Sequence, residues 1–170
     1  WEEVNYEPAG SGGRNYGWRN REGAHNNVTS EPPYFQPLVD PITEYSHAVG
    51  QSITGGFVYR GTALGTGYVG RYFFGDFVAS RIWSIALTVN PVTREASAGV
   101  AVEHTQELGA AASSPSSFGV DAAGELYVVN YNGAIYRIDG TPGQSPAPDP
   151  TEGPRRRSGD SLGRARPRVN

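Results

Sequence analysis

The sequence predicts an all-β fold assembled from a repeated unit, and three observations lead to this prediction. Residues 70–85 (GRYFFGDFVASRIWSI) and 124–138 (GELYVVNYNGAIYRI) align with an offset of 54 residues up to the turn, from Asp76 to Asn130, and of 53 residues after it. Both are aromatic and β-branched runs around a short turn, which is the pattern of a hairpin. No stretch shows a convincing 3.6-residue apolar period. A strand–turn–strand unit that recurs roughly every 50 residues is typical of a β-propeller blade.

Further strands are predicted on either side of these hairpins. Asn132-Gly133 suits the tight turn of the second hairpin, where both central residues need positive φ. Residues 52–61 form another strand candidate, and 116–129 (SSFGVDAAGELYVV) predict a strand, a turn at DAAG and a second strand. Residues 103–112 are a weak helical candidate, and we do not favour a helix there. A β-sandwich is the structural alternative, but it does not predict the repeat.

The repeat also bears on how much of a protein this chain is. Residues 1–140 correspond to two to three four-stranded blades, whereas a propeller needs about four blades or more to close. The sequence contains no Met and opens on WEEVN, which reads like the middle of a strand. We therefore expect a partial propeller, with the remaining blades supplied by a longer parent chain.

The last segment, 141–170, differs from the rest of the sequence. It holds six Pro, six Arg and four Gly, with one Leu and one Val as its large aliphatic residues. Such a composition cannot bury enough apolar surface to offset the entropy lost on ordering. We predict a disordered tail or linker; its PRRR and RARPR runs could contact an anionic partner, but a solvated linker is the favoured interpretation.

Composition excludes several classes of function. The net charge of −3 argues against a general affinity for nucleic acid. The chain has no Cys, so it has neither disulfides nor thiolate metal sites, and all 14 of its basic residues are Arg, so it has no Lys chemistry. No apolar run approaches the roughly 18–20 residues of a membrane span.

Five motifs occur in an order that resembles the C-terminal part of the glucose/sorbosone dehydrogenase family. They are WEEVN (1–5), GRNYGWRNREG (13–23), YSHAVGQSITGGFVYRG (45–61), YFFGDFVASRIWSI (72–85) and SSFGVDAAGELYVV (116–129), the last followed by GAIYRI. That family includes soluble aldose sugar dehydrogenases that depend on pyrroloquinoline quinone (PQQ). The resemblance implies a six-bladed propeller, bound calcium, hydride transfer from a sugar to PQQ, and a periplasmic or secreted location.

The resemblance also implies a metal site. Family members hold calcium with a Glu and a backbone oxygen of a Tyr, which correspond here to Glu3 and Tyr16. Ca²⁺ prefers carboxylate and carbonyl oxygens, so these ligands are chemically reasonable. Two ligands are too few, and further oxygens must come from water or other positions.

The implied quinone pocket lacks the charges that PQQ needs. Its three carboxylates require fixed cations when buried. The family's Lys falls near Val78 here, and its Arg pair falls near Ser114 and Ser116, none of which carries charge.

An aromatic residue of the family's quinone pocket falls near His47, which precedes a strand at the ligand-binding end of the propeller. Its pKa near neutrality suits proton transfer, with a packed or hydrogen-bonded loop histidine as the alternative. Tyr45, Ser52 and Arg60 would share such a site.

Other polar and aromatic residues have structural interpretations. The catalytic base of the family lies upstream of this chain, so we assign no catalytic residue here. His25 and His104 are predicted to be exposed. Asp76, Asn130 and Asp121 are interpreted as turn residues whose side chains bond nearby backbone. Trp18, Trp83, Tyr127 and Tyr136 are interpreted as packing between blades, and Gly55-Gly56 as a close backbone approach.

Two functional hypotheses remain open from the sequence. The first is part of an exported sugar dehydrogenase-like quinoprotein, in which this chain alone has no turnover. The second is a non-catalytic, calcium-stabilised propeller that binds carbohydrate or protein. The neutral residues Val78, Ser114 and Ser116 favour the second hypothesis, and the ordered motifs favour the first.

Overall fold

The computed structural model of the chain describes residues 1–140 and 166–167. This part consists mainly of short strands, with one α-helix, α1 (Thr105–Leu108), and two 3₁₀ turns, η1 (Thr66–Tyr68) and η2 (Gly109–Ala112). The prediction of an all-β fold is therefore confirmed. No helix in the described ranges has the length and apolar character needed to cross a bilayer.

Sheet one is an antiparallel four-stranded sheet in which consecutive strands are neighbours, in the order β5, β6, β7 and β10. These strands are β5 (Ile53–Val58), β6 (Tyr72–Asp76), β7 (Arg81–Ile85) and β10 (Val102–Glu103). The central pair is rich in aromatic and β-branched residues, which suit a pleated surface. The hairpin predicted over 70–85 is confirmed, because β6 and β7 pair without interruption from Tyr72 to Asp76.

Sheet two repeats this arrangement with strands β11, β12, β13 and β14. They are β11 (Pro115–Val120), β12 (Leu126–Asn130), β13 (Ile135–Arg137) and β14 (Arg166–Pro167). The hairpin predicted over 124–138 is therefore also confirmed. Two residues of the tail predicted to be disordered form β14, and the prediction for 141–165 and 168–170 lies outside the described residues.

The registers of the two sheets reproduce the sequence repeat. Asp76, at the end of β6, faces Ile53, and Asn130, at the end of β12, faces Pro115. Each first strand then has a register shift, after Thr54 in β5 and after Pro115 in β11. The first strands β5 and β11 are in contact, so the sheets are neighbours through equivalent strands.

Core one is the cluster of buried side chains between the two sheets. Alternation along the strands sends Phe73 and Ile82 of sheet one and Leu126 and Val128 of sheet two into it. Its other buried members are Tyr59, Leu64, Tyr68, Leu108, Ala111, Ala112, Phe118 and Ile138, and Tyr136 packs against it. A Cβ on Gly56 would lie 2.0 Å from the Phe73 carbonyl oxygen, so the close backbone approach predicted there is confirmed.

Core two lies on the opposite face of sheet one. Phe74, Trp83 and Ile85 pack there with Val4, beneath the small sheet formed by β1 (Glu2–Val4) and β4 (Thr43–Tyr45). The packing role predicted for Trp83 is confirmed.

The predicted packing role of Trp18 is wrong, because its side chain is 75% exposed. It lies in a lobe of long loops that holds few strands to pack against, the only ones in 6–41 being the short hairpin of β2 (Arg21–Glu22) and β3 (His25–Asn26).

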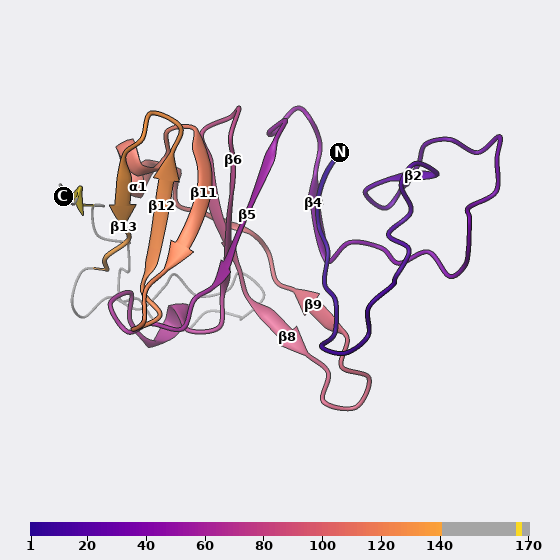
Figure 1. The fold of residues 1–170 in the computed structure, drawn as a ribbon, viewed down its shortest axis with the longest axis horizontal. Helices are drawn as coiled ribbons and strands as arrows, with labels where there is room; N and C mark the ends of the chain where they lie inside the picture. Colours follow the sequence, from indigo (N-terminus) through magenta and orange to yellow (C-terminus); the bar gives the residue numbers. More distant parts are fainter. Residues whose placement is uncertain (141–165, 168–170) are drawn as a thin grey trace, which may run out of the picture.

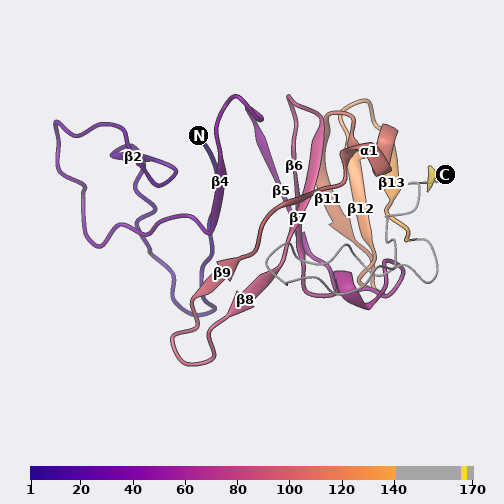
Figure 2. The same cartoon turned by 180° about the vertical axis from the view of Figure 1, so that it is seen from behind.

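Two hairpins extend beyond the sheets. His25 is exposed on β3 as predicted, and its ring stacks on that of Trp1 at a centroid distance of 3.9 Å. The second hairpin, β8 (Leu87–Val89) and β9 (Ala96–Ala98), projects away from both sheets (Figures 1 and 2).

Two expectations for 103–112 are wrong. The segment forms α1 and η2, and Leu108, Ala111 and Ala112 enter core one. His104 is only 2% exposed, because it directly precedes α1 and packs against Phe73.

Candidate functional site

Four connecting segments meet at one end of the two sheets, which we call the loop edge (upper edge of Figure 1). They are residues 46–52 before β5, 77–80 between β6 and β7, 113–114 before β11, and 131–134 between β12 and β13. Tyr45, His47, Ser52, Val78 and Ser114, which the sequence predicted to line a pocket, all lie in or next to these segments.

Asp76 organises the half of the loop edge that belongs to sheet one. Its carboxylate accepts hydrogen bonds from the Tyr45 hydroxyl (2.9 Å) and the backbone N–H groups of Ser52 (2.8 Å) and Ala79 (2.6 Å). Burial raises the pKa of Asp76, but hydrogen bonds from these donors outweigh it and the net shift is downward. Burial and the neighbouring carboxylate raise the pKa of Tyr45. The turn role predicted for Asp76 is confirmed by the bond from Ala79.

Asn130 occupies the equivalent position in sheet two. It is also buried, and its Nδ2 donates to the Ala110 carbonyl oxygen at 2.7 Å. Its side chain therefore fixes η2 beside β12 rather than bonding its own turn, so that part of the prediction is wrong. Within the described residues its Oδ1 has no hydrogen-bond partner. Asp121 does cap its own turn, accepting from the N–H groups of Ala123 and Glu125 at 2.9 Å, as predicted.

An aromatic residue follows both Asp76 and Asn130, and its backbone N–H bonds a serine at the equivalent position of each sheet. Phe77 N–H donates to the Ser52 carbonyl oxygen at 2.8 Å, and Tyr131 N–H donates to that of Ser114 at 3.1 Å. The Phe77 and Tyr131 rings meet edge to face with centroids 5.5 Å apart. Tyr131 remains 77% exposed, and Val78, which follows Phe77, is 56% exposed. The repeat therefore places aromatic groups at equivalent points of one edge.

Most of the predicted pocket residues use their polar groups within the fold. Ser114 N–H donates to Ser80 Oγ at 3.0 Å, and Ser116 Oγ donates to the Val129 carbonyl oxygen at 3.0 Å. His47 is exposed, with its Nε2 3.1 Å from Glu2 Oε1.

The charges at the loop edge do not fit PQQ. Glu2 and Asp76 are carboxylates, and the cation beside them is Arg81, whose guanidinium lies 3.8 Å from Glu103. The sequence predicted that Arg60 would share this site with Ser52. That prediction is wrong, because Arg60 follows the opposite end of β5. A ligand with three carboxylates would face more negative than positive charge here.

The predicted calcium ligands are the Glu3 carboxylate and the Tyr16 backbone oxygen, and the Glu3 carboxylate already has a partner. Glu3 Oε1 accepts from Asn5 Nδ2 at 2.9 Å. The Tyr16 hydroxyl bonds the Tyr6 carbonyl oxygen and Glu7; burial, followed by this carboxylate, raises the pKa of Tyr16 to about 12. No group of three His, Asp or Glu residues in the described part could hold a metal. One carboxylate and one carbonyl fall short of the six to eight oxygens that Ca²⁺ takes, so calcium stays a prediction.

A row of three buried polar residues, Arg71, Ser84 and His104, ending at the half-buried Glu107, was not predicted from the sequence. Arg71 Nε donates to Ser84 Oγ (2.9 Å), which lies 2.7 Å from His104 Nε2, and His104 Nδ1 lies 3.2 Å from Glu107 Oε2. The Ser–His–Glu order has the distances of a hydrolytic triad, but Ser84 is completely buried. Burial lowers the pKa of His104. These contacts connect the residue before β6 with β7 and α1, and no short sequence motif predicts them.

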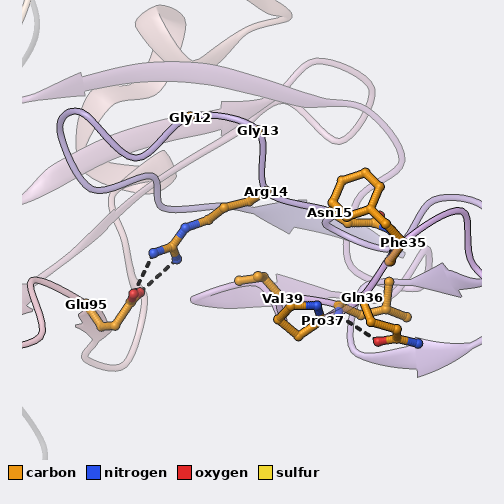
Figure 3. A pocket seen from close by; sticks show the side chains of 10 residues that line it. Gly12, Gly13, Arg14, Asn15, Phe35, Gln36, Pro37, Val39 and Glu95 are labelled. Carbon is orange, nitrogen blue, oxygen red and sulfur yellow. Dashed lines mark hydrogen bonds and ion pairs between the residues drawn. The ribbon is translucent and has the colours of Figure 1, made fainter.

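A pocket of about 550 Å³ lies in the N-terminal lobe, at the β8–β9 hairpin (Figure 3). Arg14 and Glu95 point toward one another at one side, and Phe35, Pro37 and Val39 lie at the other. The guanidinium donates two hydrogen bonds to the carboxylate, of 2.8 and 2.5 Å.

No protein-family model matches the chain, and no solved structure matches it. The resemblance to glucose/sorbosone dehydrogenases is thus carried by the sequence motifs alone.

Proposed function

We propose that the chain forms two neighbouring blades of a propeller-type binding module, and that the loop edge binds a neutral carbohydrate without redox chemistry. The repeat of strand order, register and edge contacts supports the blade interpretation. The dehydrogenase hypothesis stays a prediction, and the charges around Asp76 do not favour it.

The direction in which the sheets stack supports blades rather than a face-to-face sandwich. Phe73 and Ile82 of sheet one point into core one, whereas their equivalents Tyr127 and Ile135 lie on the opposite face of sheet two. Ile135 is 48% exposed on that face. Equivalent faces therefore point the same way, as they do around a propeller.

The aromatic pair at the loop edge is the observation that carries the binding proposal. Turn residues are usually small and polar, yet both equivalent turns place an aromatic residue directly after the Asx position. Tyr131 and Val78 expose apolar surface there, and Ser116 lies nearby at the start of β11. Aromatic faces with neutral polar groups suit a sugar ring, which has apolar C–H faces and hydroxyl edges.

The test compares exposed aromatic residues in two places. Neutral saccharides are titrated calorimetrically into the full chain, into Tyr131→Ser and into Tyr34→Ser; Tyr34 is 98% exposed and lies far along the chain, in the N-terminal lobe. We expect saturable binding that Tyr131→Ser weakens about tenfold or more and Tyr34→Ser leaves unchanged. Equal affinities for all three proteins would overturn the proposal.

A second titration separates the two hypotheses. PQQ is added with calcium present and tryptophan fluorescence is followed. We expect no saturable quenching, because Val78, Ser114 and Ser116 supply no cation. Micromolar binding, with dye reduction by an aldose, would refute the binding-module interpretation and revive the quinoprotein.

A further inference from the structure

We propose that the pocket between Arg14, Glu95 and Phe35 binds a small zwitterion with an apolar body, such as an apolar α-amino acid. This site is separate from the loop edge, and nothing in the proposed function requires it. The proposal begins with the size and composition of the pocket. Its volume of about 550 Å³ falls in the usual range for small-molecule sites, roughly 300–1,000 Å³.

The charged side of the pocket is one cation and one anion bonded to each other. Arg14 is the more buried partner, with 19% of its side chain exposed, and Glu95 has 52% exposed. Glu7 is a second, more distant anion, 3.8 Å from Arg14 Nε, and already accepts from the Tyr16 hydroxyl. Glu7 thus contacts the guanidinium on a second side, while Glu95 lies in the exposed turn between β8 and β9.

The geometry of the pair favours a ligand that replaces Glu95 on Arg14 over one that binds beside an intact ion pair. Glu95 is the exposed partner, so its carboxylate is hydrated when it leaves Arg14, and this hydration offsets part of the two hydrogen bonds that are lost. A ligand carboxylate would take over the planar fork of Arg14, which suits carboxylates in two parallel hydrogen bonds. The ligand ammonium would then pair with the released Glu95. One internal ion pair becomes two pairs with the ligand, and the net charge is unchanged.

Ligands with one charge do less well in this arrangement. A simple carboxylate would displace Glu95 and leave it unpaired beside a like charge. A simple amine would compete with Arg14 for Glu95 and leave the guanidinium without its partner. The zwitterion is the class that satisfies both groups at once.

The opposite side of the pocket accommodates the apolar body. Phe35, Pro37, Leu38 and Val39 line it, and Phe35 is 46% exposed. Asn15 holds this wall in place. Its side-chain Nδ2 donates to the Phe35 carbonyl oxygen at 2.8 Å, and its backbone carbonyl oxygen accepts from Val39 N–H at 2.8 Å. Covering Phe35 removes apolar surface from water, so the side chain of the amino acid adds affinity.

The experiment titrates three related compounds into the full chain by ligand-observed NMR and calorimetry. They are L-phenylalanine, 3-phenylpropionate, which lacks the ammonium, and 2-phenylethylamine, which lacks the carboxylate. We expect L-phenylalanine to bind about tenfold more tightly than either analogue, because each analogue leaves one charged group of the pocket without its partner. Backbone amide shifts should be confined to the pocket walls.

Variants identify the groups responsible. Glu95→Gln should remove the preference of L-phenylalanine over 3-phenylpropionate, and Arg14→Gln its preference over 2-phenylethylamine. Arg94→Gln is the matched control, because Arg94 neighbours Glu95 in the same turn but does not line the pocket. Thermal unfolding of each variant confirms that the chain is folded. Absence of saturable binding, equal affinity for the three compounds, or tighter binding of a neutral polyol would each overturn the proposal.

Discussion

Replacing Asp76 by Ala should destabilise the fold more than any other single change at the loop edge. Its carboxylate satisfies three donors, the Tyr45 hydroxyl and the N–H groups of Ser52 and Ala79, and it is completely buried. A hydrogen bond to a charged group contributes about 1.5–3 kcal/mol. Three such bonds give an upper value near 5–9 kcal/mol. Because water can occupy the space left by the shorter Ala side chain and bond these donors, we expect a loss of about 3–5 kcal/mol.

Asp121→Ala is the matched control. Asp121 also accepts from two backbone N–H groups and a tyrosine hydroxyl, that of Tyr127, but it is exposed to solvent. Its donors can turn to water, so the loss should be much smaller. Urea unfolding followed by tryptophan fluorescence measures both, since Trp83 lies in core two with Tyr45 against it. If Asp76→Ala loses no more stability than Asp121→Ala, burial is not what makes the Asp76 bonds valuable.

Three further outcomes follow from core one and its neighbours. The folded-state pKa of His104 lies below its ordinary value. The stability that neutral His104 contributes is therefore complete above about pH 6.5 and is lost as the pH falls from there toward the lowered pKa. His104→Gln should reduce the fall of the urea midpoint between about pH 7.5 and 5.5. Gly56→Ala should destabilise by about 1–3 kcal/mol, because its Cβ meets a backbone oxygen, whereas Gly12→Ala, where the space is open, should be near neutral in the same unfolding assay. Phe73→Ala should cost about 3–5 kcal/mol of unfolding free energy by calorimetry and Trp18→Ser almost none, since the first is fully buried and the second exposed.

The strands were predictable because their information is local. Period-2 runs of aromatic and β-branched residues fix β6, β7, β12 and β13, and the 54-residue offset identifies Asp76 and Asn130 as equivalent. The serine–aromatic contacts at the loop edge extend the same repeat into β5 and β11. Their offset of 62 residues, from Ser52 to Ser114, is larger because the connection between β5 and β6 is longer than the one between β11 and β12.

The features that the sequence did not predict depend on contacts between segments far apart in the chain. His104 follows a glutamate in a polar stretch and reads as exposed, but α1 turns it toward Ser84, 20 residues away. Arg14 and Glu95 are separated by 81 residues, so no local pattern joins them. Asn130 could bond its own turn or its neighbour, and η2 decides between the two. Burial and pairing of this kind are set by tertiary packing, which single-sequence patterns do not contain.

Because equivalent faces of the two sheets point the same way, the two ends of the stack differ. Sheet one has both faces covered, by core one and core two, whereas sheet two leaves the face with Tyr127 and Ile135 partly open. Such a surface is heterologous: it accepts a different face from its own, and addition continues until a ring closes. The number of repeats that completes the circle, rather than the strength of any one contact, would then decide whether this architecture stays discrete or grows.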